Sequence, residues 1–269
     1  MENKYLLLTF DIEEFVCASE FGLDTSKDRA FEVGRNGLLN IMKVLKDNNL
    51  KATFFTTLEF AQKNKDLLQQ LISNNNEIAL HGYNHNTSYH IMPEHQLMEE
   101  LEMAKRELEE IINKKVRGFR SPQMRKLNSR VLNKLGFAYD SSLHPTFVPG
   151  NNQIFKSRKV YRENNVFTVP VSVVPFVRLP FSWIWFRNLG LSYVKMCTSL
   201  CLKDKDYINL YFHPWDFYNT NTAEFKGVNK LWLRNSGDNA LKELDDYCKW
   251  CINKNILPKT ISEYLEIDK

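Results

Sequence analysis

The sequence predicts a single α/β domain folded as a distorted, incomplete (β/α) barrel, seven-stranded and similar in plan to a TIM barrel. Strand-like and helix-like segments alternate along about 250 residues, which is typical of parallel strands joined by helices. Apolar residues make up 43% of the 269 residues, and a chain of this size can bury one large core. No linker, low-complexity tract or repeat divides the chain, so we expect one domain over residues 1–269.

In the first half, short apolar runs alternate with amphipathic segments. The run at residues 5–11 predicts a buried first strand that is followed by acidic side chains. Helical periodicity is found at residues 33–48, 58–73, 93–113 and 128–135. Runs rich in apolar and β-forming residues predict further strands at 52–57, 77–81, 116–120 and 137–140.

The second half is less regular. Residues 160–161 and 166–174 predict two strands around a turn at Asn164-Asn165. Helices are expected at residues 191–202 and 238–253. The almost wholly apolar run at 207–213 predicts a buried late strand, and a last short strand is expected near Leu257.

Composition and charge exclude several classes of protein. The net charge is only +4, and the densest basic groups, at residues 114–117 and 156–159, are short. This pattern favours solvated turns over a nucleic-acid surface, and no nucleic-acid-binding motif is present. The first apolar run is too short for a signal peptide, and no stretch approaches the roughly 20 apolar residues of a membrane span. We therefore expect a cytoplasmic protein without a signal or transmembrane segment.

Five cysteines, at positions 17, 197, 201, 248 and 251, form no disulfide framework. The pairs Cys197/Cys201 and Cys248/Cys251 have a spacing that a four-thiolate zinc site could use. Both pairs lie in helical patterns beside apolar residues, where cysteine behaves as a small buried hydrophobe. We expect reduced, buried thiols.

Polar residues follow five different strands of the predicted barrel. Asp11, His81, Arg120, Asp140 and His213 each lie at or just past the C-terminal end of a strand. In a (β/α) barrel those ends meet on one face, where active sites are built. The sequence therefore predicts that these five side chains share one site.

The chemistry of these residues suits metal-assisted hydrolysis. If the chain turns into a helix after residue 81, His81 and His85 face the same way and can both bind a divalent ion. Asp11 and Glu13 flank one residue of an extended strand and point to the same side, so one can bind the metal while the other polarises water. Taken alone, the carboxylates could instead cap a strand end, and the histidines could be an ordinary pair.

Two further residues have candidate roles in the same site. Arg120 beside Asp11 would orient that carboxylate and favour its charged form. His213 could protonate a leaving group, with Asp140 holding its other ring nitrogen. The alternatives are an ordinary loop arginine and a buried structural histidine.

The segment 181–186 is the most aromatic of the chain. It could be a lip that stacks on sugars, a dock for peripheral association with a membrane surface, or a patch for a partner. The alternative is that these aromatic side chains pack beneath an irregular loop.

With these residues placed, the chain resembles the polysaccharide deacetylase superfamily, the chitin and peptidoglycan deacetylases of carbohydrate esterase family four. The resemblance runs from Thr9 to about Asp216. It implies that Asp11 is the catalytic base, Arg120 of the Arg-x-Pro motif its brace, His213 the general acid and Asp140 the tether of His213. It implies a metal held by Glu13, His81 and His85. The run 213–216 is similar to a subgroup found in exopolysaccharide and capsule gene clusters.

The chain departs from the family pattern at several positions. The family's metal carboxylate is usually aspartate, so Glu14 is an alternative to Glu13. Gln123 replaces a tyrosine whose backbone N–H serves the family as an oxyanion donor. Tyr211 replaces a leucine that lines the acetyl-methyl pocket, and Trp215 lies in the same predicted substrate region.

The resemblance implies a hydrolase of carbon–nitrogen bonds other than peptide bonds, which removes acetyl from an N-acetylated sugar of a glycan or glycan precursor. The implied cofactor is a divalent ion, zinc first, with cobalt or nickel as alternatives. One alternative function is hydrolysis of a non-sugar amide on the same fold, as by an allantoinase. Another is a catalytically silent glycan-binding protein.

Overall fold

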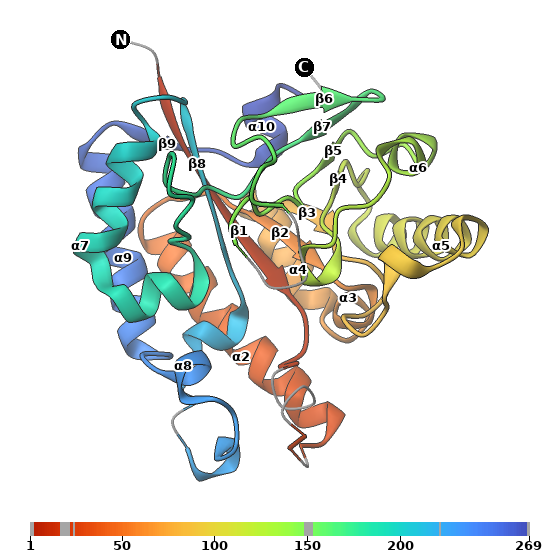
Figure 1. Cartoon of the computed structure of the whole chain (residues 1–269). Helices are drawn as coiled ribbons and strands as arrows, with labels where there is room; N and C mark the ends of the chain where they lie inside the picture. Colours follow the sequence, from red (N-terminus) through yellow and green to blue (C-terminus); the bar gives the residue numbers. More distant parts are fainter. Residues whose placement is uncertain (1–2, 17–21, 24, 148–152, 221, 268–269) are drawn as a thin grey trace.

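One curled sheet organises the whole molecule (Figure 1). The computed structural model of the chain describes residues 3–16, 22–23, 25–147, 153–220 and 222–267. The strands of the sheet are β1 (Lys4–Ile12), β2 (Thr53–Thr56), β3 (Glu77–Leu80), β4 (Gly118–Phe119), β5 (Tyr139–Asp140), β6 (Tyr161–Glu163), β7 (Val166–Thr168), β8 (Tyr207–Phe212) and β9 (Ile256–Pro258). Their order is β6-β7-β5-β4-β3-β2-β1-β8, and β9 pairs with β1.

The first strand lies at the centre of this arrangement. Thr9 of β1 pairs in parallel with Thr53 of β2 on one side and with Tyr211 of β8 on the other. The incomplete (β/α) barrel is confirmed, but the described part of the chain forms nine strands instead of the expected seven. The hairpin partner β6 adds an antiparallel edge, and β9 adds a short strand beside the start of β1.

The gap in the barrel is almost bridged by the chain after β7. The expected strand at 166–174 pairs in the sheet only as far as Thr168. Beyond it, the backbone N–H of Ser172 donates to the carbonyl oxygen of Asn209 in β8 at 2.8 Å. The segment thus leaves one edge of the sheet and reaches the other.

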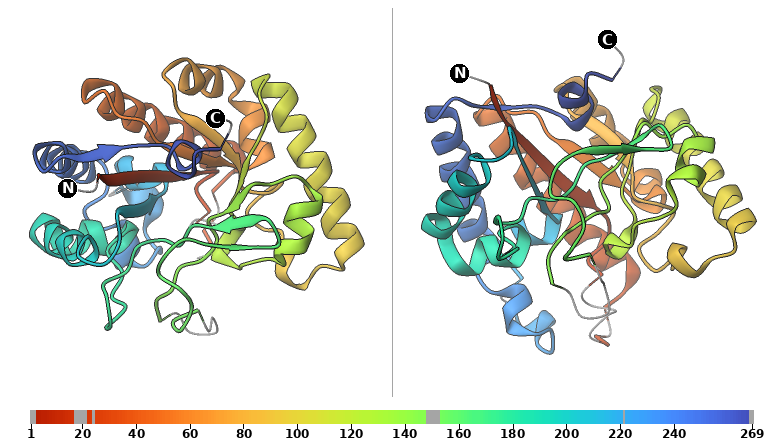
Figure 2. Two further views of the ribbon diagram at one scale, coloured as in Figure 1. Left: turned by 90° about the horizontal axis from the view of Figure 1, so that it is seen from above. Right: turned by 45° about the horizontal axis from the view of Figure 1, so that its top comes forward.

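Helices lie around the outside of the curled sheet (Figure 2). They are α2 (Lys27–Asp47), α3 (Leu58–Lys63), α4 (Lys65–Ser73), α5 (Glu94–Ile112), α6 (Ser129–Lys134), α7 (Trp183–Cys201), α8 (Lys230–Leu233), α9 (Asp238–Asn253) and α10 (Ile261–Leu265). Short 3-10 turns complete the described elements: η1 (Tyr89–Ile91), η2 (Pro122–Met124), η3 (Pro214–Phe217) and η4 (Ala223–Phe225).

Three helices differ from expectation for local reasons. The helix α2 starts at Lys27 and not at 33, because the Ser26 hydroxyl caps it by accepting the backbone N–H of Arg29. The expected helix 58–73 divides at Asn64, whose side chain bonds to the Phe60 carbonyl. The helix α7 begins before residue 191, and Gly190 interrupts it with φ +77°.

The two faces of β1 have different neighbours, because side chains alternate along a strand. Leu6, Leu8, Phe10 and Ile12 pack outward into the main core beneath the helices. On the inward face, Leu7 belongs to a small core inside the barrel that α10 closes from the N-terminal end of the strands. The next inward positions are Thr9 and Asp11, so polarity rises toward the C-terminal end.

A pair of glycines on α2 lets two loops come close to that end of the barrel. A Cβ at Gly34 would lie 2.5 Å from the carbonyl oxygen of Glu13, and one at Gly37 would lie 1.9 Å from that of Pro214. Neither approach tolerates a side chain. The helix therefore supports the segments that follow β1 and β8.

The expected buried thiols are found in α7 and α9, at Cys197, Cys201, Cys248 and Cys251. The fifth cysteine, Cys17, lies outside the described residues. None of the helices that the structure describes is long and apolar enough to cross a bilayer.

The buried amine of Lys205 generates a prediction about pH. It donates to the Ser172 hydroxyl at 2.7 Å, and burial lowers the pKa of Lys205 to about 7. In the unfolded chain, a lysine has a pKa of about 10.4. Above pH 7 the unfolded state therefore keeps the proton on Lys205 while the folded state loses it, and stability rises with pH. Relative to Lys205→Met, the wild type should gain up to about 2 kcal/mol of unfolding free energy between pH 7 and 9.

Urea unfolding at the two pH values measures this difference. Lys203→Met is the matched control, because Lys203 is exposed and close in sequence, and its stability relative to wild type should not change with pH. A pH-independent difference between wild type and Lys205→Met would contradict the prediction.

Candidate active site

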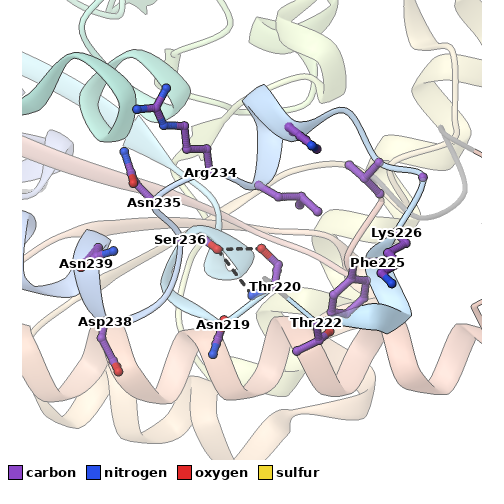
Figure 3. A pocket seen from close by; sticks show the side chains of 14 residues that line it. Asn219, Thr220, Thr222, Phe225, Lys226, Arg234, Asn235, Ser236, Asp238 and Asn239 are labelled. Atoms are coloured by element: carbon purple, nitrogen blue, oxygen red, sulfur yellow. Dashed lines mark hydrogen bonds between the residues drawn. The ribbon is translucent and has the colours of Figure 1, made fainter.

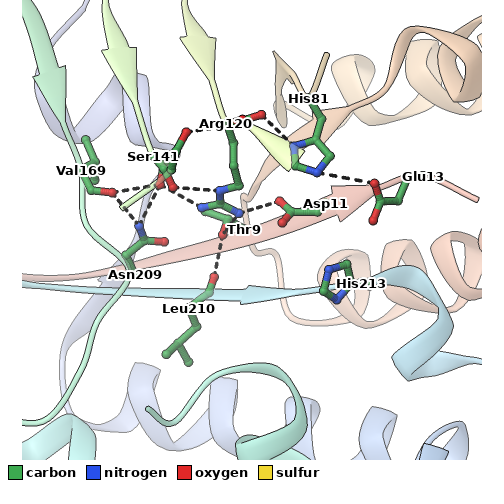
Figure 4. Close-up of polar contacts among 12 residues, drawn as sticks. Thr9, Asp11, Glu13, His81, Arg120, Ser141, Val169, Asn209, Leu210 and His213 are labelled. Atoms are coloured by element: carbon green, nitrogen blue, oxygen red, sulfur yellow. Dashed lines mark hydrogen bonds and ion pairs between the residues drawn. The ribbon is translucent and has the colours of Figure 1, made fainter. Parts of the chain in front are cut away.

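A fully buried arginine holds the centre of the site (Figure 4). The Arg120 guanidinium donates from Nη1 to Asp11 Oδ1 at 2.6 Å and to Thr9 Oγ1 at 2.9 Å. Its other nitrogens donate to the carbonyl and hydroxyl oxygens of Ser141. Its Cζ atom lies 4.1 Å from the centre of the Phe55 ring. The sequence-predicted contact between Arg120 and Asp11 is present, and a buried, short, charge-assisted bond fixes the carboxylate.

The same arginine also orients a histidine through its backbone. His81 Nδ1 lies 2.8 Å from the Arg120 carbonyl oxygen, which only accepts, so Nδ1 carries the proton and Nε2 keeps its lone pair. That Nε2 lies 3.5 Å from Glu13 Oε2. The sequence positions Glu13, His81 and Arg120 thus meet from three strand ends.

The chain does not turn into a helix after residue 81, the condition under which His81 and His85 would face the same way on a helical surface. Residues 81–88 form a loop. Position 82 requires glycine, because its φ is +83° and a Cβ there would lie 2.5 Å from the Tyr89 ring. The Tyr89 hydroxyl also accepts the backbone N–H of Tyr83. The loop still directs His85 inward, and its Nε2 lies 3.8 Å from Glu13 Oε1.

These three side chains fit a divalent cation. Glu13 is fully buried, and its two oxygens face the two imidazole nitrogens. Ligand atoms bound about 2.1 Å from one tetrahedral ion lie about 3.4 Å from each other, close to these separations. Burial lowers the pKa of His81, and it lowers the pKa of His85 to about 4, so both rings are the neutral species that a metal needs. Within the described ranges, no three His, Cys, Asp or Glu side chains are already close enough together to form a complete metal site.

The choice between the two glutamates follows from their surroundings. Glu14 is also buried, and its charged neighbours are Glu59 and Lys27 on the helical side. Burial raises the pKa of Glu14 above its usual value. Only Glu13 faces His81 and His85, so Glu13 is the candidate ligand.

The surroundings of His213 differ from the sequence prediction. Asp140 accepts from the backbone N–H and the hydroxyl of Ser142, and among the described residues it makes no contact with His213. Asp216 is the neighbouring carboxylate. Its Oδ2 accepts the His213 backbone N–H at 2.8 Å and lies 3.9 Å from His213 Nδ1. Its other oxygen pairs with buried Arg187 at 2.8 Å.

Aromatic rings surround the His213 imidazole. Trp215 stacks on it with ring centres 4.4 Å apart, and Trp183 meets it edge-on at 4.8 Å. Burial lowers the pKa of His213 well below its ordinary value. The ring is therefore neutral at rest.

A cavity of about 270 Å³ lies among these groups and is lined by most of the sequence-predicted residues. The sequence-predicted residues in its lining are Asp11, Glu13, His81, His85, Gln123, Tyr211, His213 and Trp215. Gln123 adopts φ +56°, a left-handed conformation that is uncommon outside glycine. Among the described residues, Arg120 and Asp140 do not line the cavity. Arg120 therefore contacts Asp11 from the side away from the cavity.

Sequence reasoning missed five lining residues: Val16, Met124, His144, Trp183 and Trp232. His144 is buried and lies edge-on to Tyr211, and burial lowers its pKa to about 3. Its only signal was its position four residues past the end of β5. Trp183 belongs to the aromatic segment, but nothing in the sequence indicated that this ring, and not its aromatic neighbours, would line the cavity.

The aromatic segment 181–186 mostly packs inward. Phe181 and Phe186 are buried, and Trp183 lines the cavity. Trp185 alone of its aromatic rings is exposed, at 39%.

A second, wider hollow lies beside η4 and α8 (Figure 3). Its lining runs from Asn219 to Asn239, and the Thr220 and Ser236 hydroxyls bond to each other at 2.6 Å there. It contains none of the predicted catalytic residues. The sequence-predicted site residues therefore gather at the smaller cavity and not at this hollow.

Comparison with known proteins decides the family. The model of the polysaccharide deacetylase family matches residues 1–139, just over half of the sequence. The chain belongs to the polysaccharide deacetylase family. Membership indicates a deacetylase-type hydrolase. No curated protein matches the chain in sequence.

Solved structures share the fold of this chain at low identity. A Mycobacterium smegmatis protein described as a polysaccharide deacetylase is 18% identical over 98% of this chain and 90% of its own, with a TM-score of 0.69. The Puue allantoinase is 15% identical over 97% and 89%, with a TM-score of 0.67. A family 4 carbohydrate esterase from Streptomyces lividans, in complex with acetate, is 15% identical over 97% and 95%, with a TM-score of 0.56.

The buried pair of Arg120 and Asp11 generates a stability prediction. Arg120→Met should lower the unfolding free energy by about 3–5 kcal/mol, because it leaves a buried carboxylate without its cation. Adding Asp11→Asn removes that charge, so the double variant should be more stable than the sum of the two single losses allows. Denaturant unfolding of all four proteins measures the coupling, and additive losses would contradict it.

Proposed function

We propose that this protein is a metal-dependent hydrolase that removes the acetyl group from an N-acetylated sugar of a glycan or glycan precursor. The observation that carries the proposal is one cavity in which Asp11 is braced by Arg120 while Glu13, His81 and His85 converge beside it. Family membership supports the deacetylase chemistry.

Glu13, His81 and His85 would hold the divalent ion, which supplies Lewis acidity to the acetamide oxygen and lowers the pKa of water. We propose zinc, because one carboxylate and two imidazoles form a donor set that zinc hydrolases use. The His81 tautomer, set by the Arg120 carbonyl, is already the one that presents Nε2.

Asp11 accepts a proton from the attacking water. Its carboxylate lines the cavity on the inward face of β1, and Arg120 engages Oδ1 at 2.6 Å. This bond holds the carboxylate in one orientation while the water approaches, so the base is positioned before the substrate arrives. Thr9 and Ser141 hold the arginine in turn.

His213 donates a proton to the leaving amine. Burial keeps the ring neutral at rest. The ring takes up a proton from solvent as negative charge develops on the substrate in the same cavity, and passes it to the nitrogen as the carbon–nitrogen bond breaks. Asp216 positions His213 by accepting its backbone N–H. The sequence instead predicts that Asp140 holds the His213 side chain. The Gln123 backbone N–H is the proposed oxyanion donor, and Tyr211 and Trp215 bound the acetyl group.

We also propose that the protein belongs to the exopolysaccharide and capsule subgroup, because the run His213-Pro214-Trp215-Asp216 is similar to that subgroup. Trp215 stacks on His213, and Asp216 binds its backbone.

A second candidate function is hydrolysis of a small non-sugar amide. The modest cavity volume, about 270 Å³, favours it.

Acetate release from an N-acetylhexosamine panel tests the proposal. The zinc-loaded protein should release acetate, a chelator should abolish the activity, and added zinc should restore it. Asp11→Asn should reduce the rate by at least about 100-fold. An inactive zinc-loaded protein that instead hydrolyses small non-sugar amides would favour the second candidate.

Two histidine variants provide a matched control. His85→Ala should lose both activity and stoichiometric zinc in metal analysis. His90→Ala, an exposed histidine in the same part of the chain, should keep both. Equal behaviour of the two variants would remove His85 from the site.

A further inference from the structure

Two loops lie side by side on one side of the molecule (Figure 2, left). One carries residues 153–158 and the other residues 174–180. Arg178 Nη1 donates to the Lys156 carbonyl at 2.9 Å, and Arg158 Nε donates to the Val173 carbonyl at 3.2 Å. These crossed bonds make the two loops one surface.

Large apolar side chains project from this surface into solvent. Phe176 is 97% exposed and Phe155 is 92% exposed, and Val177 and Leu179 are exposed beside them. We call these four residues the apolar rim. Phe176 also holds φ +60°, where bulky residues are rare. So much apolar area at two joined loop tips is typical of a binding surface and not of an ordinary solvated loop.

The rim lies in a strongly basic part of the chain. Between residues 141 and 203 the sequence has a single acidic residue, Glu163. The same stretch has eight basic residues: Lys156, Arg158, Lys159, Arg162, Arg178, Arg187, Lys195 and Lys203. Its surplus of positive charge therefore exceeds the +4 of the whole chain, and the rest of the protein is net acidic.

Two of these arginines line a hollow between the exposed phenylalanines. Arg158 and Arg178 share it with Phe155, Phe176 and Asp204. Asp204 pairs with Arg158 at 2.7 Å, while Arg178 has no carboxylate partner among the described residues. Burial and the nearby charge of Arg158 lower the pKa of Arg178. An anion in the hollow would relieve that repulsion.

We propose that the apolar rim docks the protein on a bilayer surface that contains anionic lipid. Phe155 and Phe176 enter the boundary between headgroups and acyl chains, and Arg178 meets a lipid phosphate. This combination of exposed aromatic residues with flanking cations is how peripheral proteins bind membranes. It differs from the dock that the sequence offered as one alternative at 181–186, where only Trp185 is exposed among the aromatic residues.

The docked orientation would bring the cavity close to the membrane. The His144 backbone N–H donates to Gln153 Oε1 at 2.8 Å, two residues before Phe155. Leu179 precedes Trp183 by four residues, and His144 and Trp183 both line the cavity. With the proposed function granted, the substrate class is a lipid-linked glycan whose sugar lies near the headgroups.

Cosedimentation of the full chain with vesicles tests the docking. Wild type should bind vesicles of phosphatidylcholine mixed with phosphatidylglycerol more tightly than vesicles of phosphatidylcholine alone, and salt should weaken the difference. Phe155→Ser with Phe176→Ser should weaken binding by roughly tenfold or more. Arg178→Gln should weaken binding to the anionic vesicles about fivefold.

Ile91→Ser is the matched control, because Ile91 is 75% exposed outside the rim, and it should bind as wild type does. Acetate release from a soluble substrate should be unchanged in the rim variants, which also shows that they fold. Wild type that stays in the supernatant, or a double variant that sediments like wild type, would overturn the docking. A protein that binds vesicles but releases no acetate would overturn only the proposed function.

Discussion

The buried guanidinium of Arg120 is the constraint on which the rest of the site depends. A cation inside a protein is costly unless every donor is used, and here the donors meet Asp11, Thr9 and Ser141 above the Phe55 ring. The backbone of the same residue accepts from His81. One residue thus positions both the candidate base and a candidate metal ligand, so their relative placement cannot drift independently.

The barrel supplies that constraint through the alternation of β1. Odd-numbered positions face the interior, which is apolar at Leu7, hydroxylic at Thr9 and charged at Asp11. The helix α2 then approaches closely at Gly34 and Gly37, under the backbone of Glu13 and Pro214. The candidate carboxylates and His213 are therefore supported by the core and not by mobile loops.

Much of this could be predicted because the signals are local. The apolar run of β1, the alternation of Asp11 with Glu13, and the polar residue after each strand are all visible in the order of residues. Fold class and the meeting of Asp11, His81 and Arg120 followed from them. The split at Asn64 was harder, since one side-chain bond to the Phe60 carbonyl decides it.

The rest depends on contacts between distant segments. The loop that brings His85 to Glu13 depends on the close approach of Tyr89 to Gly82. Asp216 replaces Asp140 beside His213 because the turn after β8 folds its carboxylate back, where Arg187 of α7 pairs with it. His144 and Trp232 reach the cavity from irregular segments. No periodicity marks such positions, so sequence patterns could not identify them.

The most direct test of the central claim is a crystal structure of the zinc-soaked protein with anomalous scattering recorded at the zinc edge. We expect one strong peak within about 2.0–2.2 Å of a Glu13 oxygen and of Nε2 of His81 and His85. Asp11 should remain bonded to Arg120 in that structure. A peak elsewhere in the chain, with these three side chains uncoordinated, would contradict it.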